Sequence, residues 1–262
     1  MVLRVTAINP EELLLAYRLG IFPMAESRTA EEVLWVRPHE RGILPLETFH
    51  VPRRLARAVR MDRYDVTVDT AFNEVVRGCA ESQPDRRETW INDPIIEVFE
   101  ILHRRGFAHS VETWHEGRLV GGLYGLSLGA AFFAESKFSR MTDASKVALV
   151  HLAARLKAGA YALLDAQFPN PHLEQFGAIT VTEERFQSLL SKALARNGDF
   201  YCLGAPGGAP CAGTAVAGGG VAAGFAGADS GTEAGLAAPG AGTAAAATGA
   251  GSSVLQVITQ TS

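Results

Sequence analysis

The sequence has few cysteines and no long apolar run. Its three cysteines, Cys79, Cys202 and Cys211, make no even disulfide framework and lack the CxxC spacing of a metal site. No apolar segment approaches the roughly 18 residues of a membrane span. The first residues, MVLRVTAINPEELL, lack the apolar core and cleavage site of a signal peptide. These absences predict a reduced, cytoplasmic setting and no membrane partner.

Positive charge is missing from the last part of the chain. All 24 Lys and Arg residues lie before residue 203, and the segment 203–262 has only Asp229 and Glu233 as charges. This segment contains 15 Gly and 18 Ala, so it cannot bury enough side-chain surface to offset the entropy lost on ordering. We therefore expect 203–262 to be a disordered tail with no inferred function, in which the apolar run 254–258 is too short to matter.

The basic residues of the first 202 positions are clustered. Residues 1–202 carry all 24 basic residues and 26 of the 28 acidic ones, a net charge of −2, which does not indicate a coat for nucleic acid. However, Arg53, Arg57 and Arg60 follow Pro52 at the i, i+4 and i+7 spacing of one helix face. Such a strip either contacts a phosphate backbone or faces solvent, and the lack of interleaved acids slightly favours phosphate.

The start of the chain predicts a small N-terminal unit, residues 1–48. Asn9 followed by Pro10 and two acidic residues is typical of a helix start, and Gly20 is expected to end that helix. A short strand is expected at 33–36, where Arg37-Pro38 breaks it.

The larger unit, 49–202, mixes the two periodicities. Apolar positions at helical spacing predict helices at 52–60, 70–79, 92–106, 144–158 and 182–194. Alternating or apolar runs predict strands at 64–68, 109–114, 119–128, 132–134 and 161–164, with a hairpin turn at Glu116-Gly117. The order predicts an α+β fold with a mixed, largely antiparallel sheet flanked by helices.

The stretch 130–149 joins an apolar strand to a helix through a polar turn that includes Glu135, Lys137 and Arg140. A turn of this kind brings backbone donors and side chains together at a helix N-terminus, where a site can form. An ordinary solvated strand–loop–helix connection explains the same residues.

Asp165 and Gln167 end the strand predicted at 161–164, and period-2 alternation points them the same way. A carboxylate beside an amide can orient or deprotonate an amine and donate to a developing oxyanion. A capping Asp with a structural Gln fits the spacing equally well.

A series of short segments carries a resemblance that spacing alone does not supply. The segments are AYRLGIFP (16–23), LW (34–35), TWI (89–91), HSVE (109–112), LVGGLYG (119–125), ES (135–136), FSRM (138–141), ASK (144–146), LDAQ (164–167) and FGA (176–178). In this order over about residues 10–202, the chain resembles the leucyl/phenylalanyl-tRNA–protein transferase family.

The resemblance implies an aminoacyltransferase of the N-degron pathway. Members move Leu or Phe, and sometimes Met, from aminoacyl-tRNA to the N-terminal Arg or Lys of a protein, which marks it for degradation. The implied catalytic domain is GNAT-like and follows a small N-terminal domain. No metal or organic cofactor is implied, because the ester to tRNA is already activated; a monomer is expected.

The resemblance also assigns site residues. Asp165 and Gln167 match the family's D-x-Q motif, in which the Asp either engages the acceptor amine or polarises the Gln; both roles stay open. The positions matched to substrate contacts are Trp90, Phe132, Glu135, Leu164 and Asn170. Phe132 and Glu135 are expected to form one wall of an aminoacyl-adenosine site. Arg53, Arg57 and Arg60 match positions that contact the tRNA backbone.

Two residues depart from the family pattern. Ala134 and Lys137 stand where members usually have Gly and Met. A cation near an apolar pocket is costly unless paired, so we expect Lys137 to turn outward or to alter donor preference.

Two alternatives remain. A CoA-dependent N-acetyltransferase of the same fold needs a glycine-containing pyrophosphate loop, and no Gly lies between Phe138 and Ala158. A non-catalytic tRNA-binding module is the other alternative, against which the intact Asp165 and Gln167 argue.

Overall fold

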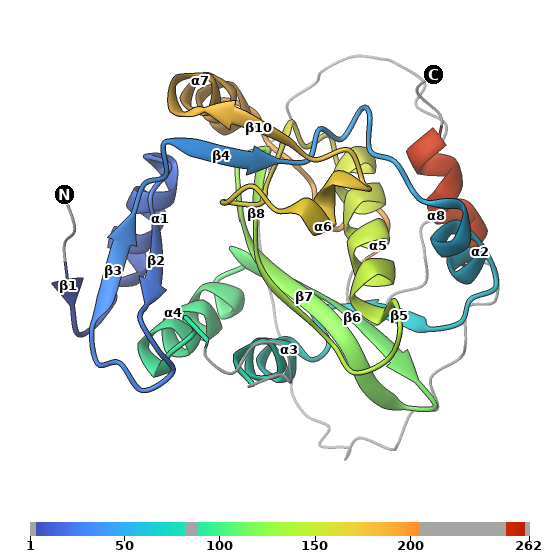
Figure 1. Cartoon of the computed structure of the whole chain (residues 1–262), viewed down its shortest axis with the longest axis horizontal. Coiled ribbons are helices and arrows are strands. Elements are labelled where there is room, and N and C mark those ends of the chain that lie inside the picture. The colour runs from blue at the N-terminus through green and yellow to red at the C-terminus, as the bar shows by residue number, and fades with distance from the viewer. Residues whose placement is uncertain (1–3, 82–88, 205–249, 260–262) are drawn as a thin grey trace, which may run out of the picture.

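Two β-sheets of unequal size, flanked by helices, form the framework of the protein (Figure 1). The structure is a computed structural model and describes residues 4–81, 89–204 and 250–259. The smaller sheet is antiparallel in the order β1-β3-β2. Its strands are β1 (Arg4–Val5), β2 (Phe22–Ala25) and β3 (Val33–Val36), and α1 (Pro10–Arg18) packs beside β2.

Helix α1 begins as the sequence predicts. The Asn9 side chain accepts a hydrogen bond from the Glu11 amide at 2.8 Å, and Pro10 occupies the first turn. Gly20 follows the helix with a φ of 74°, a conformation that favours glycine. The residues after it form β2, a strand that the sequence did not predict.

The larger sheet has seven strands in the order β10-β4-β9-β8-β7-β6-β5. They are β4 (Glu40–Ile43), β5 (Asp65–Val68), β6 (Ala108–His115), β7 (Arg118–Leu128), β8 (Ala131–Ser139), β9 (Leu163–Asp165) and β10 (Ile179–Thr182). Only the β8–β9 pairing is parallel. The predicted α+β fold with a mixed, largely antiparallel sheet is confirmed. The sequence did not predict β4 and β10, and β4 joins this sheet although residues 40–43 fall in the expected N-terminal unit.

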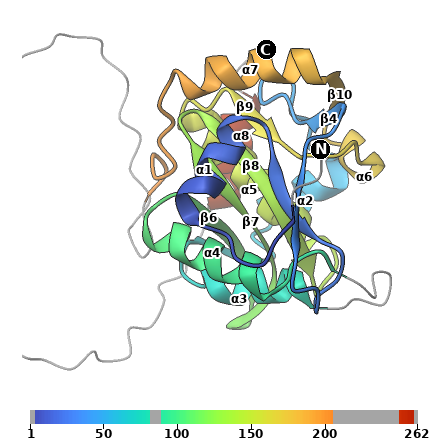
Figure 2. The ribbon, with the colours of Figure 1, turned by 90° about the vertical axis from the view of Figure 1, so that its left-hand side faces the viewer.

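The helices cover both faces of the large sheet, and each face has its own apolar cluster. They are α2 (Arg53–Arg60), α3 (Phe72–Ala80), α4 (Asp93–Arg104), α5 (Ala144–Ala158), the short α6 (Pro171–Glu174), α7 (Glu183–Leu194) and α8 (Ala250–Thr259). The first cluster unites α1, α3, α4 and α7 with Phe133 and Leu163, whereas the second unites α2, α5 and α8 with Phe132 and Leu164. Neighbouring strand residues thus point to opposite faces. Figure 2 shows α1 and α4 in front of the large sheet, on the first face.

The helix α8 corrects the expectation that the whole tail is disordered. Residues 205–249 and 260–262 lie outside the described residues, but Ala250–Thr259 is a helix that packs against α2 and α5 (Figure 1). Val254 and Ile258, from the run judged too short, are only 8% and 7% exposed. The composition of the tail indicates only how much apolar surface the tail can bury within itself. In the structure α2 and α5 supply the apolar surface against which α8 packs.

A β-bulge interrupts the pairing of β7 with β8. Gly125 pairs with Ala134 and Tyr124 with Ser136, so Glu135 has no opposite residue in β7. Bulges re-aim a side chain and are frequent next to active sites. None of the described helices is long and apolar enough to cross a membrane.

Candidate active site

A pocket of about 180 Å³ opens where the smaller sheet meets the end of β9. Its lining residues are Phe22, Met24, Trp90, Glu135, Ala166, Gln167, Phe168, Pro169 and Asn170. The apolar side chains come from β2, from Trp90 in the segment before α4 and from the loop after β9, while the polar groups come from the bulge of β8 and the same loop. The pocket therefore has apolar walls around a few polar groups, as ligand pockets commonly do.

Asp165 lies beneath this pocket in a buried ion pair with Arg41. The Arg41 Nε donates to Asp165 Oδ1 at 2.8 Å, and Arg41 Nη2 donates to Oδ2 at 2.6 Å. The two side chains are only 2% and 0% exposed. The guanidinium also lies over the rings of Phe22 and Phe186, at 4.7 and 4.3 Å from their centroids. A bidentate, buried pair of this kind fixes the carboxylate in one orientation.

The ion pair also fixes Gln167. The Gln167 amide donates to Asp165 Oδ1 at 3.0 Å, and its backbone takes a φ of 59°. A positive φ is uncommon for a residue with a side chain and usually marks a constrained site. The Gln167 Nε2 donates to Glu135 Oε1 at 3.1 Å. The carboxamide and the Glu135 carboxyl are thus held side by side in the pocket.

Glu135 is a titratable group at neutral pH. Burial raises the pKa of its carboxyl to about 8; the Tyr17 hydroxyl opposes this rise, Asp165 adds to it, and Arg41 opposes it. Burial and the Glu135 carboxyl raise the pKa of Tyr17 well above its ordinary value. Among the described residues the buried Tyr17 hydroxyl has no hydrogen bond of normal geometry, so the two groups influence each other without a tight bond. A carboxyl with such a pKa can exchange protons near pH 8.

The pocket brings together four of the predicted substrate-contact and catalytic residues: Trp90, Glu135, Gln167 and Asn170. Asn170 is exposed and also caps α6, where it accepts a hydrogen bond from the His172 amide at 2.9 Å.

The pocket lining does not include Phe132 or Leu164. Both are fully buried in the cluster on the α5 face. Contrary to the expectation, Phe132 and Glu135 therefore do not form one wall of the pocket. Side chains alternate between the two faces along 132–135 of β8, so Phe132 and Glu135 point to opposite faces of the sheet. Lys137 is exposed, in line with the expectation that it turns outward.

The arginine strip lies on the other side of the sheet. Arg53, Arg57 and Arg60 are exposed on α2, whose apolar residues Leu55 and Val59 belong to the cluster on the α5 face. The structure therefore places the strip and the pocket on opposite faces of the large sheet.

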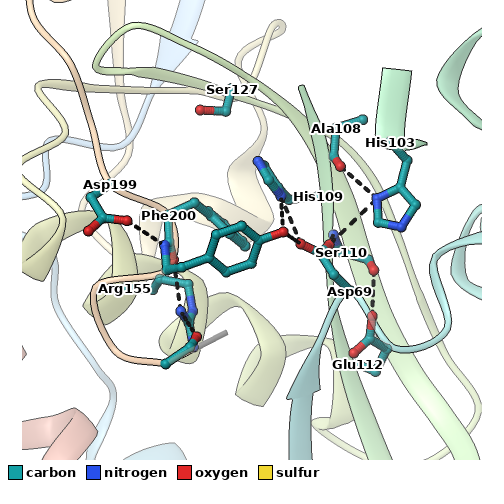
Figure 3. Close-up of polar contacts among 12 residues, drawn as sticks. Asp69, His103, Ala108, His109, Ser110, Glu112, Ser127, Arg155, Asp199 and Phe200 are labelled. Carbon is teal, nitrogen blue, oxygen red and sulfur yellow. Dashed lines mark hydrogen bonds and ion pairs between the residues drawn. The ribbon is translucent and has the colours of Figure 1, made fainter. Parts of the chain in front are cut away.

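A second polar cluster surrounds Asp69 at the end of β5 (Figure 3). One carboxylate oxygen accepts from the Ser110 amide at 2.7 Å, and the other lies 2.8 Å from His109 Nδ1 and accepts from the Tyr201 hydroxyl at 2.5 Å. Burial alone would raise the pKa of Asp69. The hydrogen bond and charge of His109, together with the hydrogen bonds from Tyr201 and the Ser110 amide, outweigh this effect and lower the pKa.

The same cluster fixes the segment that follows α7. The Phe200 ring stacks on His109 with centroids 4.0 Å apart, and Arg155 donates to the carbonyl oxygens of Phe200 and Gly204 at 2.7 and 2.9 Å. These residues do not line the pocket, so we assign them a structural role.

Sequence reasoning missed Arg41 and Tyr17 as site residues. Arg41 lies in a strand that the sequence did not predict, and no nearby residue in the sequence indicates that this arginine is buried rather than exposed. Tyr17 lies within 16–23, a segment that carries the resemblance, but the resemblance assigned it no role. In the described part of the chain, no group of three or more His, Cys, Asp or Glu side chains could hold a metal ion.

The fold and the pocket define an α+β protein in which a carboxyl, a carboxamide and a buried ion pair meet in a small, partly apolar pocket. The family model of the leucyl/phenylalanyl-tRNA protein transferase matches residues 43–191, and the model of that protein's N-terminal domain matches residues 6–39. The chain therefore belongs to the leucyl/phenylalanyl-tRNA protein transferase family.

Curated relatives agree with this assignment. The chain is 56% identical over 202 residues to the leucyl/phenylalanyl-tRNA–protein transferase of Hyphomonas neptunium, which covers 77% of this chain and 78% of the relative. The proteins of the same name from Caulobacter vibrioides and Paramagnetospirillum magneticum are 55% and 57% identical, and each match covers 92% of the relative.

Among solved structures, L-PGS from Bacillus licheniformis matches with a TM-score of 0.35 and 15% identity, over 64% of this chain and 54% of that chain. This likeness is too slight to support an argument about the fold.

Proposed function

We propose that the protein moves leucine or phenylalanine, with methionine as a third donor residue, from aminoacyl-tRNA to the N-terminal Arg or Lys of acceptor proteins. The modified proteins are thereby marked for degradation. Family membership supports the reaction type, and one observation carries the location of the site: the Arg41–Asp165 pair holds Gln167 beside Glu135 in the pocket.

The reaction is an aminolysis of an ester. The acceptor's α-amino nitrogen bonds to the carbonyl carbon of the aminoacyl group, and the bond from that carbon to the ribose oxygen then breaks. The amine gives up one proton and the ribose hydroxyl takes one up. Because the ester is already activated, the protein has to position the two reactants and handle the proton.

Gln167 and Glu135 suit these two tasks. The Gln167 carboxamide can donate to the oxyanion that develops on the carbonyl oxygen. The pKa of about 8 for Glu135 lies close to that of an α-amine, roughly 7.7–8.0, so proton exchange between them is nearly balanced.

Asp165 acts on Gln167 rather than on the acceptor amine. Its side chain is 0% exposed, and its two oxygens already accept from Arg41 and from the Gln167 amide. Of the two roles that the motif left open, engaging the acceptor amine or polarising Gln167, this geometry favours action on Gln167, which Asp165 holds through the Gln167 backbone amide.

The remaining substrate contacts have unequal support. Trp90 and Asn170 line the pocket, which supports contact with the aminoacyl-adenosine end. Phe132 and Leu164 rest on the family resemblance alone. For Arg53, Arg57 and Arg60, exposure on one helix supports contact with the tRNA backbone.

Several broader features belong to the same proposal. The larger unit is GNAT-like, and the protein works as a cytoplasmic monomer without a cofactor. A small N-terminal domain, 1–48, precedes a catalytic domain, 49–202; the pairing of β4 with β9 and β10 favours a boundary nearer residue 40.

A direct test supplies labelled Leu-tRNA and a peptide with N-terminal Arg to the wild type and to an Asp165→Ala variant. We expect the wild type to label the peptide and the variant to lose most of that activity. A matched control is Asp93→Ala, since Asp93 is exposed and lies outside the pocket lining.

The same assay separates the alternatives. Absence of transfer by the wild type, with tRNA still bound, would support the non-catalytic tRNA-binding module. Transfer from acetyl-CoA to the peptide would support the N-acetyltransferase.

A further inference from the structure

The helix α8 is held by polar contacts at both of its ends. The Gly251 amide donates to Asp62 Oδ1 at 2.9 Å, and the Lys157 ammonium donates to the Ile258 carbonyl oxygen at 2.6 Å. A carboxylate at the N-terminus and a cation at the C-terminus match the two poles of the helix dipole. The contacts therefore specify the direction in which α8 docks.

The packing of α8 against α2 is close. A Cβ atom at Gly251 would lie 1.9 Å from the Val59 carbonyl oxygen, so only glycine allows this approach. Val254 and Ile258 are buried in the same cluster as Leu55 and Val59 of α2. The docked face of α8 is thus shaped for α2 and α5.

A fixed cluster holds residues 200–204, the last described residues before α8. Phe200 stacks on His109, and its carbonyl oxygen accepts a hydrogen bond from Arg155 (Figure 3). The Tyr201 hydroxyl donates to Asp69. Among the described residues, 200–204 are thus held by the Asp69 cluster with Arg155, and α8 is held by α2 and α5.

Helix α2 needs such support. It has only eight residues and no side-chain hydrogen bond at its N-cap, Pro52. Isolated helices of this length are unstable in water and depend on packing for their structure. The packing comes from α5 and α8, while Arg53, Arg57 and Arg60 stay exposed.

The helix α8 has no charged residue in its sequence, AGSSVLQVIT. No charged side chain of α8 can therefore attract or repel phosphate, and we expect its docking to affect tRNA binding through the order of α2. Since an ordered arginine strip pays less conformational entropy on binding than a loose one, support for α2 raises affinity.

We propose that α8 is a brace, formed by the chain's own tail, that holds α2 in place and thereby increases the affinity of the protein for tRNA. This inference rests on the proposed role of α2 in tRNA binding.

The test compares two neighbouring substitutions in the full-length chain. Val254→Asp places a carboxylate in the buried face of α8, whereas Ser253→Asp places the same charge on its exposed face. We expect Val254→Asp to speed hydrogen exchange of the α2 amides and to raise the Kd for Leu-tRNA by about tenfold. Ser253→Asp should match the wild type in both measurements. Gly251→Ala, which favours the helix but clashes with Val59, should behave like Val254→Asp.

Three results would overturn the brace. They are unchanged α2 exchange in Val254→Asp and Gly251→Ala, faster exchange with an unchanged Kd, and tighter tRNA binding, which would instead make α8 a competitor of tRNA. A variant with alanine at Arg53, Arg57 and Arg60 tests the underlying proposal separately. If it binds tRNA like the wild type, the role of α2 in tRNA binding fails, while α2 exchange still reports whether α8 holds the helix.

Discussion

At the scale of single residues, the Arg41–Asp165 pair sets the geometry of the pocket, because Asp165 also accepts from the Gln167 backbone amide. Both charges are almost completely buried, so breaking the pair is costly. Replacing Arg41 with leucine leaves a buried carboxylate without its partner. We expect the free energy of unfolding to fall by about 3–5 kcal/mol. The double variant Arg41→Leu/Asp165→Leu should recover most of this loss, because no unpaired charge remains.

Urea unfolding of the wild type, the single variant and the double variant measures these differences. A double variant that is less stable than the Arg41→Leu variant would contradict the account. The transfer activity of the double variant should stay low, because the Gln167 backbone amide has lost its acceptor, Asp165 Oδ1.

Glu135 should make stability depend on pH. Its folded pKa of about 8 lies above its ordinary value of 4.5, so folding favours the protonated form. The stabilisation is complete below pH 4.5 and is lost as pH rises through 8. Relative to Glu135→Gln, the wild type should lose stability over this window by at most about 1.4 kcal/mol per pH unit.

Urea unfolding at a series of pH values compares the two proteins, with the exposed Glu174→Gln as control. Parallel curves for the wild type and Glu135→Gln between pH 4.5 and 8 would show that the Glu135 carboxyl is not perturbed.

At the scale of elements, β4 braces the loop that follows β9. The Gly42 amide donates to the Gln167 carbonyl at 3.1 Å, and its own carbonyl accepts from the Ala166 amide at 2.9 Å. A Cβ atom at Gly42 would lie 2.5 Å from the Phe168 carbonyl oxygen. Gly42→Ala should therefore displace the pocket loop and lower the transfer rate about tenfold or more.

The same variant should bind tRNA with near-normal affinity, since the arginine strip lies on the other side of the sheet. Transfer kinetics and a tRNA titration on one protein preparation measure both quantities. Equal losses of rate and affinity would mean that the fold as a whole, rather than the loop, has changed.

The sequence predicted elements well where their signals were local. The helix at Pro10 has its own cap, and the β6–β7 hairpin has a Glu116-Gly117 turn with both φ angles positive. It missed β4, β10 and α8, which depend on partners far along the chain. The site was predictable only in part for the same reason: Gln167 and Glu135 lie in recognisable segments, whereas Arg41 is defined by its contact with Asp165.

At the scale of the whole molecule, the small N-terminal unit shares its core with the larger one. Tyr17 and Val33 belong to the same apolar cluster as Phe99 and Phe133. The Arg41 guanidinium also donates to the Gly20 carbonyl at 3.0 Å. We therefore expect a single cooperative unfolding transition rather than two.

Variants that retain one tryptophan test this expectation. Trp35 reports on the small sheet and Trp114 on β6 of the large one. Their fluorescence should give the same urea midpoint. Separate midpoints would show that the N-terminal unit unfolds independently.

The pocket at the end of β9 depends on all three levels of structure. The position of Gln167 depends on the Arg41–Asp165 pair and on β4, and the N-terminal unit supplies Phe22 and Met24 to the pocket lining. The most direct measurement is the transfer rate of Gln167→Ala at saturating Leu-tRNA and Arg-peptide, with the exposed Gln175→Ala as control. We predict a fall in kcat of about 100-fold or more for Gln167→Ala, as for other lost oxyanion donors, and little change for the control. A Gln167→Ala enzyme that transfers leucine at the wild-type rate would contradict the account.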